Sequence, residues 1–263
     1  MAGEEANVSD RPEREEADDR DASGAPTAST LLGGPVCTRT AERSLHVNLV
    51  PEGARHCNLD CLYCPFPRAG PHRRWPRPGD LGAAVMNALH DAPDIDSITV
   101  SGPGDPTLHP GFGRALGDVL SARRVREDLP VRVVTNAWRL LDPHVRRLLG
   151  FVDERIVRID AGGERIARPR DPASLHELRM ALGELADFSI EAVFVEGPDG
   201  NANPRDVDAW LDLVSSLGPK RVYVTTSAEA PLEPGTHPAS PGMLGSIAAR
   251  LHARTGRSVT VVP

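Results

Sequence analysis

Lysine, cysteine and aromatic residues are scarce in this sequence. Among its 263 residues there are one lysine, Lys220, four cysteines and 4% aromatic residues. Four cysteines in a chain of this length do not build a disulfide scaffold, so we expect free thiols in a reducing compartment. With one lysine, covalent catalysis through a lysine amine is confined to a single position.

Long apolar segments are also missing. No run of about 18 apolar residues occurs, so we expect no membrane-spanning helix. The first residues are acidic and lack the apolar stretch of a signal peptide, which leads us to expect a cytoplasmic protein. The net charge is −7, but residues 1–21 hold nine acids and three arginines, and the remainder is nearly neutral. Bulk charge therefore indicates neither nucleic acid nor an anionic membrane as a partner.

Two regions differ in composition. Residues 1–43 are charged, rich in small and polar residues and without apolar period, so we expect a disordered acidic tail. From 44 to 263, short β-branched runs alternate with stretches of helical spacing. The runs fall at about 45–50, 96–101, 131–135, 154–159, 189–195, 220–225 and 258–262. Six alternations predict one α/β domain with a parallel sheet, with fewer units than the eight of a closed barrel.

Glycine-rich and polar clusters follow six successive predicted strands. They read "ARHCNLDCLYC", "GPGDPTLHP", "NAW", "DAGGE", "EGPDGNAN" and "TSAEAP" in chain order. The carboxyl ends of parallel strands lie at one edge of the sheet, and their loops carry the chemistry in such folds. We therefore expect one functional site, built from these loops.

Three of the four cysteines stand in "RHCNLDCLYCPFPR", residues 55–68. Cys57, Cys61 and Cys64 have the spacing Cys-x3-Cys-x2-Cys, which suits an iron–sulfur cluster or zinc. A cubane held by three cysteines leaves one iron free to take a small molecule, whereas structural zinc needs a fourth protein ligand. Candidates for that ligand are Cys37, His46, His56 and His72. On the residues alone both metals stay open, as do buried thiols without a function.

The segment "CNLDCLYC" resembles the cluster loop of radical SAM (S-adenosylmethionine) enzymes. The resemblance implies a partial (βα)6 TIM-like barrel over 44–263, with Cys57, Cys61 and Cys64 binding a [4Fe–4S] cluster. It also implies SAM on the open iron, an electron donor of the flavodoxin or ferredoxin type, and SAM cleavage to a 5′-deoxyadenosyl radical. That radical would abstract hydrogen from a substrate, which the resemblance does not name.

Other loops extend the resemblance. "SGPGDPTLHP" (101–110) is similar to the family's Gly-Gly-Glu element, whose carbonyls and acid hold the SAM ammonium; glycine allows close approach. This chain has Asp105 where Glu is common, so the side chain is one methylene shorter. The next strand ends would meet the ribose, and "AVFVEGPDGN" (192–201) would pack on the adenine. The implied cofactor-binding residues are Tyr63, Gly102, Gly104, Asp105, Asn136, Asp160 and Val195.

Within the family, the pattern is closest to the branch of tRNA wyosine-synthesis enzymes. "SLHVNLVP", "DAGGERIARP" and "VTTSAEAPLEPGTHPAS" carry this likeness. Those enzymes hold a second cluster, for which Cys37 alone remains here. They are also thought to use a lysine Schiff base, whereas Lys220 begins a predicted strand and so lies at the end away from the cluster. The likeness therefore predicts the radical initiator and not wyosine synthesis itself.

Several residues near the predicted site are candidates for substrate contact. The connector "PFPRAGPHRRWPRPGD" carries four arginines and Trp75 and could meet an anionic substrate or RNA, or be a solvated linker. The predicted substrate-binding residues on the loops are His109, Arg168, Asn201 and Glu229. The substrate itself would be a small metabolite or a modified nucleoside.

Two other functions fit parts of the sequence. A glycyl-radical-enzyme activase has a single cluster and a similar size, but "GPGDPTLHP" suits it less well. A zinc- or cluster-binding regulatory module would need no SAM and no catalysis. Metal content and SAM binding distinguish the regulatory module from both enzymes.

Overall fold

A computed structural model gives the fold, and it describes residues 32–37, 43–50, 56–66, 75–160, 175–227 and 234–262. Its strands are β1 (Leu32–Cys37), β2 (Arg43–Val47), β3 (Ser97–Val100), β4 (Val131–Thr135), β5 (Glu154–Arg158), β6 (Phe188–Glu196), β7 (Val222–Thr226), β8 (His237–Pro238) and β9 (Val259–Val262). Its α-helices are α2 (Pro78–Asp91), α3 (Phe112–Ala122), α4 (Pro143–Leu149), α5 (Leu175–Gly183), α6 (Pro204–Leu217) and α7 (Pro241–Thr255). Three 3₁₀ turns lie at Pro106–Leu108, Arg123–Arg126 and Trp138–Leu141.

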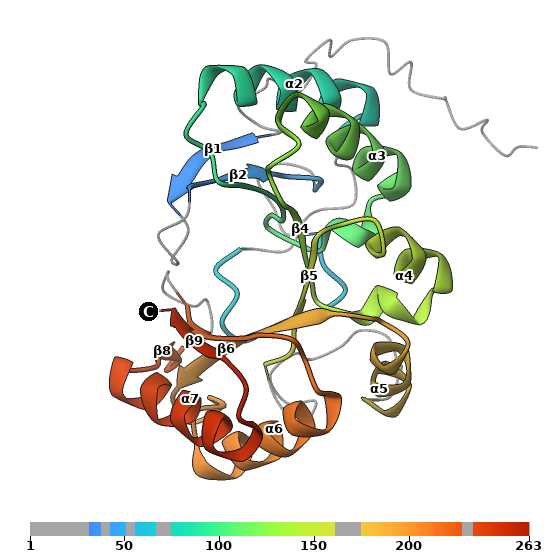
Figure 1. The fold of residues 1–263 in the computed structure, drawn as a ribbon. Helices are drawn as coiled ribbons and strands as arrows, with labels where there is room; N and C mark the ends of the chain where they lie inside the picture. Colours follow the sequence, from blue (N-terminus) through green and yellow to red (C-terminus); the bar gives the residue numbers. More distant parts are fainter. Residues whose placement is uncertain are drawn as a thin grey trace, which may run out of the picture.

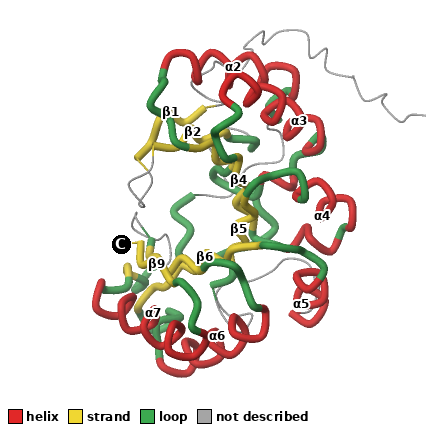
Figure 2. Tube along the Cα trace, in the orientation of Figure 1, coloured by secondary structure: helices red, strands yellow, loops and turns green. Residues whose placement is uncertain are grey.

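One curved sheet organises the molecule. Its strand order is β1-β2-β3-β4-β5-β6-β7-β9, and the neighbours from β2 to β9 are parallel. The sheet bends into an open arc with the helices on its convex side (Figure 1), and Figure 2 shows the same alternation of strand and helix along the trace. The predicted six strand–helix units, and with them the partial TIM-like barrel, are confirmed.

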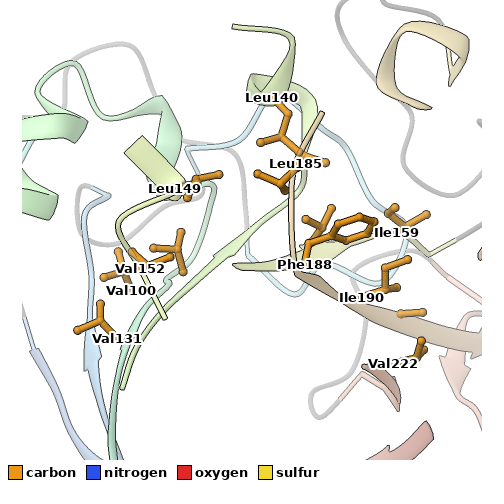
Figure 3. Packing of buried hydrophobic residues seen from close by; sticks show 14 of the residues in the cluster. Val100, Val131, Leu140, Leu149, Val152, Ile159, Leu185, Phe188, Ile190 and Val222 are labelled. Atoms are coloured by element: carbon orange, nitrogen blue, oxygen red, sulfur yellow. The ribbon is translucent and has the colours of Figure 1, made fainter. Parts of the chain in front are cut away.

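The two faces of the sheet have different chemistry because side chains alternate along a strand. On β6, Phe188, Ile190 and Phe194 belong to the main core under the helices, where Phe194 meets Trp210 of α6 edge to face at 5.0 Å. Figure 3 shows the buried side chains of the core around Phe188 and Ile190. The intervening Glu191 and Val193 line a cavity on the other face. The concave face is therefore available for polar chemistry.

N-terminal capping residues of the helices hold the loops at the carboxyl edge of the sheet in place. Asn203 caps α6 by accepting a hydrogen bond from the Asp206 amide at 3.1 Å, and Ser240 caps α7 through the Met243 amide at 3.3 Å. Proline follows each cap in the first turn, where its missing N–H costs nothing. Asn203 follows the predicted substrate residue Asn201 and has a structural role as a cap.

The N-terminal boundary differs from the expectation. Leu32–Cys37, inside the segment predicted to be a disordered tail, form β1, which pairs antiparallel with β2. Main-chain hydrogen bonding to a sheet edge needs no apolar period, so composition alone did not reveal this strand. Residues 1–31 and 38–42 lie outside the described residues. Among the described helices, none has the length and apolar character needed to span a bilayer.

Candidate active site

The cysteine loop follows β2 and is joined to the loop after β3 through backbone contacts. His56 forms a parallel bridge with Gly104, and the Asp105 amide donates to the His56 carbonyl at 2.9 Å. A Cβ at position 104 would lie 2.0 Å from that carbonyl oxygen, so this close approach requires glycine. The first of the three cysteines, Cys57, is thereby placed against the carboxyl ends of β3 and β4.

Cys57 accepts two N–H groups at its sulfur. The Asn136 amide nitrogen Nδ2 lies 3.3 Å from Cys57 Sγ, and the Leu59 backbone nitrogen lies 3.4 Å from it. Asn136 Nδ2 also donates to Asn58 Oδ1 at 2.8 Å, while its own Oδ1 accepts from the Trp138 amide. N–H donors to sulfur stabilise a thiolate and are a usual feature of iron–sulfur sites. Asn136 is therefore a positioning residue for Cys57.

Cys61 and Cys64 lie further along the loop, in different surroundings. Cys61 packs against a small apolar cluster of Leu62, Tyr63, Val193 and Val195. Burial, with the charge of Asp160 second, raises the pKa of the Cys61 thiol far above its usual range. A thiol so placed becomes a thiolate when a metal cation supplies the missing positive charge. Cys64 is partly exposed, and its amide closes a turn onto the Cys61 carbonyl at 3.2 Å.

The chemistry of these donors fits an iron–sulfur cluster. Thiolates are soft ligands of the kind that such clusters use. The two N–H groups on Cys57 Sγ are the kind of outer donor that tunes a cluster ligand.

Tyr63, within the cysteine loop, and Asp160, just after β5, form a buried pair. The Tyr63 hydroxyl donates to Asp160 Oδ2, and the Val193 amide donates to Asp160 Oδ1 at 2.8 Å. Burial raises the pKa of Asp160 to about 6, against the opposing effects of Arg158 and the Tyr63 hydrogen bond. Burial also raises the pKa of Tyr63. A SAM contact for either residue stays a prediction.

Asn201 joins the ends of β5 and β6. Its Nδ2 donates to the Asp160 carbonyl at 2.5 Å and to the Val193 carbonyl at 2.8 Å, and its Oδ1 accepts from the Val195 amide at 2.8 Å. The side chain is 1% exposed, so these backbone bonds account for its amide. The arrangement gives Asn201 a structural role, and substrate contact stays untested.

The side chain of His109 also forms its hydrogen bonds with the protein backbone. Its Nε2 lies 2.7 Å from the Pro76 carbonyl and its Nδ1 accepts from the Gly111 amide at 2.9 Å, so the partners select the neutral tautomer with hydrogen on Nε2. Trp75 lies between His56 and His109, with ring centroids 4.8 and 5.4 Å away. The ring that the sequence offered for substrate stacking thus packs against two histidines, and Arg77 beside it is exposed.

Both carboxylate oxygens of Asp105 accept hydrogen bonds from within the protein. Its Oδ1 accepts from the Thr107 amide at 2.9 Å and from the Thr107 hydroxyl, and its Oδ2 accepts from Thr135 Oγ1 at 2.8 Å and the Asn136 amide at 2.7 Å. With 1% exposure, this carboxylate ties the loop after β3 to the end of β4. The shorter side chain therefore has a positioning function, and a direct bond to SAM stays a prediction.

The remaining predicted residues divide into two groups. Gly102 and Val195 lie at the carboxyl edge: a Cβ on Gly102 would lie 2.3 Å from Asn48 Oδ1, and Val195 packs under the cysteine loop. Arg168 and Glu229 lie outside the described residues. Lys220 is exposed and precedes β7, at the amino edge of the sheet, as the sequence predicted. It lies at the edge opposite the cysteine loop.

The concave face carries charged residues that the sequence reasoning missed. A cavity of about 640 Å³ extends inward from Tyr63 and Phe66, and Arg132, Glu154, Arg158, Glu191 and Arg221 are among its lining residues. The signal was present in β5, where Glu154, Ile156 and Arg158 alternate with residues facing the other way. Charges at period two in a strand covered by helices indicate a polar lumen.

Comparison with known sequences agrees with the cysteine loop. The family model described as the radical SAM superfamily matches residues 52–186. A UPF0026 protein of Helicobacter pylori strain J99 is 25% identical over 208 residues, which cover 74% of this chain and 66% of that protein. A second UPF0026 protein, from strain 26695 of the same species, is 28% identical over 66% of this chain and 59% of its own length. This chain thus spans less than two thirds of these relatives.

Solved structures share the fold at low identity. Streptococcus suis SuiB bound to S-adenosylmethionine has a TM-score of 0.59 at 14% identity, covering 81% of this chain and 49% of that one. TYW1 with a lysine–pyruvate adduct bound has a TM-score of 0.57 at 12% identity, covering 80% and 73%. At these identities, the likeness shows a common architecture only.

Proposed function

The chain belongs to the radical SAM superfamily, and on that basis we propose that it cleaves S-adenosylmethionine reductively and abstracts hydrogen from a substrate. Membership supports SAM-dependent radical chemistry in general. A [4Fe–4S] cluster on Cys57, Cys61 and Cys64, with SAM bound, would supply a 5′-deoxyadenosyl radical. The observation that carries the proposal is the position of three cysteines on one loop at the carboxyl edge, with two N–H donors on Cys57.

The protein's own residues would prepare this site in three ways. Asn136 and the bridge between His56 and Gly104 hold Cys57 in place. The apolar cluster around Cys61 excludes water from the inner side of the loop. Asp160 offers a buried acceptor below the loop, where a ribose hydroxyl could bind. The substrate would occupy the cavity beneath, and a small metabolite or a nucleoside would fit its volume.

The electron needed for cleavage would come from a flavodoxin- or ferredoxin-type protein. All three cysteines are partly exposed, so a cluster on them would lie within reach of such a donor. Three cysteines on one loop would also need a reducing setting, which is the basis for proposing a cytoplasmic protein.

Anoxic reconstitution tests the proposal. We expect about four irons per chain, and 5′-deoxyadenosine after addition of SAM and dithionite. Cys61→Ala should abolish this product, whereas Cys37→Ala, which alters the cysteine outside the trio, should retain it. Zinc in place of iron, or product formation by Cys61→Ala, would refute the assignment.

A further inference from the structure

The cavity beneath the cysteine loop has an uneven charge. Three arginines (Arg132, Arg158 and Arg221) and two glutamates (Glu154 and Glu191) line it. Burial lowers the pKa of His46, the remaining titratable base in the lining. The arginines and glutamates of the described lining together carry one net positive charge.

At the amino end of the cavity, Arg132 and Arg221 share one carboxylate, Glu154, so the excess positive charge lies at this end. Glu154 pairs with Arg132 at 3.0 Å and accepts hydrogen bonds from Ser189 at 2.8 Å and Tyr223 at 3.1 Å. Arg221 lies 3.9 Å from the same carboxylate and is mostly exposed. This group is a structural network with its acceptors in use.

The pair nearer to the cysteine loop is different. Arg158 Nη2 donates to Glu191 Oε1 at 2.9 Å, and 37% of the Arg158 side chain and 22% of the Glu191 side chain remain exposed. Arg158 Nε is buried, so a ligand would meet the exposed part of the guanidinium. Within the described part of the chain, the hydrogen bond to Glu191 is the one that this guanidinium donates, so its exposed N–H groups are available to an acceptor on a ligand. Arg158 also lines the same cavity as Tyr63, under the loop that holds Cys61.

We propose that Arg158 binds a carboxylate group of the substrate and so holds the reacting part of that substrate below the cysteine loop. The proposal rests on the proposed radical SAM function. A guanidinium presents its N–H groups as a planar fork that matches a carboxylate, and Glu191 fixes the plane by holding Nη2. Because Glu191 already balances the charge of Arg158, a carboxylate would add one negative charge beside this pair, whereas a phosphate monoester would add about two. The structure therefore favours a monocarboxylate over a phosphorylated substrate.

Matched probes test this on the reconstituted protein with saturating SAM. The probes are 3-phenylpropanoate, its neutral amide 3-phenylpropanamide, and phenyl phosphate, with binding followed by ligand-observed NMR. We expect the carboxylate to bind at least about tenfold more tightly than the amide, since charged hydrogen bonds contribute about that much. Arg158→Gln should reduce the preference to within about twofold. Arg254→Gln, which alters an exposed arginine paired with Asp212, should preserve it.

A second variant covers the case in which Arg158→Gln does not fold. Arg158→Lys keeps the charge but loses the fork, so it should retain a preference for the carboxylate at several-fold lower affinity. Unchanged affinity in either variant, no carboxylate preference in the wild type, or tighter binding of phenyl phosphate overturns the proposal. Weaker SAM binding by Arg158→Gln also overturns it, because Arg158 would then serve the cosubstrate. Wild-type protein that binds the carboxylate but yields no 5′-deoxyadenosine would instead contradict the radical SAM proposal alone.

Discussion

Substituting Gly104 should separate the cysteine loop from the sheet. In Gly104→Ala, the new Cβ would lie 2.0 Å from the His56 carbonyl oxygen and 2.7 Å from its carbon. A carbon-to-oxygen contact needs about 3.3 Å, so the two backbones must move apart by roughly 1.3 Å. Backbone cannot rotate away as a side chain can, and the 2.9 Å hydrogen bond from the Asp105 amide to His56 would break.

The loss of stability in Gly104→Ala comes mainly from the hydrogen bond that this backbone movement breaks. A buried donor left without a partner costs about 1–3 kcal/mol, and displacement of the bridge adds to it, so we expect a loss of about 2–4 kcal/mol in unfolding free energy. For a chain of this size, that corresponds to a Tm lower by roughly 5–15 °C. Because His56 precedes Cys57, the variant should also hold less iron than wild type after reconstitution.

The measurements are thermal unfolding and iron content, with Gly117→Ala as the control. Gly117 lies in α3, and a Cβ there would meet nothing within 4 Å. Alanine at that position should raise stability by about 0.5–1 kcal/mol. If Gly104→Ala had the wild-type Tm and full iron content, the bridge would not be what positions the cysteine loop.

Further predictions concern the residues under the loop. Burial raises the pKa of Asp160 from 3.8 to about 6 in the folded protein. The contribution of this group to the free energy of unfolding is therefore greatest below pH 4, and it falls by about 3 kcal/mol as the pH rises through 6. Urea titrations at pH 4–7 should show this slope in wild type and not in Asp160→Asn. Tyr63→Phe removes a hydrogen bond from that buried carboxylate, and thermal unfolding should report a loss of about 1–3 kcal/mol, with Tyr223→Phe as the comparison at a half-buried hydroxyl. Asn136→Ala removes an N–H donor from Cys57 and should weaken cluster retention by about 10–100-fold, measured as the rate of visible bleaching under a chelator; wild-type bleaching would contradict a role at Cys57.

The sequence predicted the positions of the strands from β2 onwards well, because the signals for them are local. β-branched runs separated by helical spacing require nothing beyond their own residues, and β4 begins and ends at the predicted positions. The strand β1 could not be found this way. Its sequence, LGGPVC, has no alternation, and its conformation comes from pairing with β2. Edge pairing is a tertiary contact that composition does not encode.

The same limit applies to the site. A cysteine spacing is a local motif, and it identified the candidate metal-binding loop without any structure. Whether a polar side chain faces a ligand or the backbone depends on neighbours far along the chain: Asn201 bonds to Asp160, 41 residues away, and Asp105 to Thr135, 30 residues away. Position at a strand end therefore predicted where these residues lie but not what their side chains do.

The residues that select the substrate should be those whose side chains are not already bonded within the fold. At the carboxyl edge, Asp105, Asn136 and Asn201 direct their hydrogen bonds into the fold, so substitutions there should change cluster assembly or stability before they change substrate choice. Deeper in the cavity, Glu154 has its acceptors in use, whereas the Arg158 guanidinium is 37% exposed and donates to Glu191 alone among the described residues. Exposed N–H groups in a cavity are available to a ligand, and fully bonded neighbours are not. Variation at position 158 among related chains should therefore follow substrate charge, and related chains that share a substrate should keep the arginine.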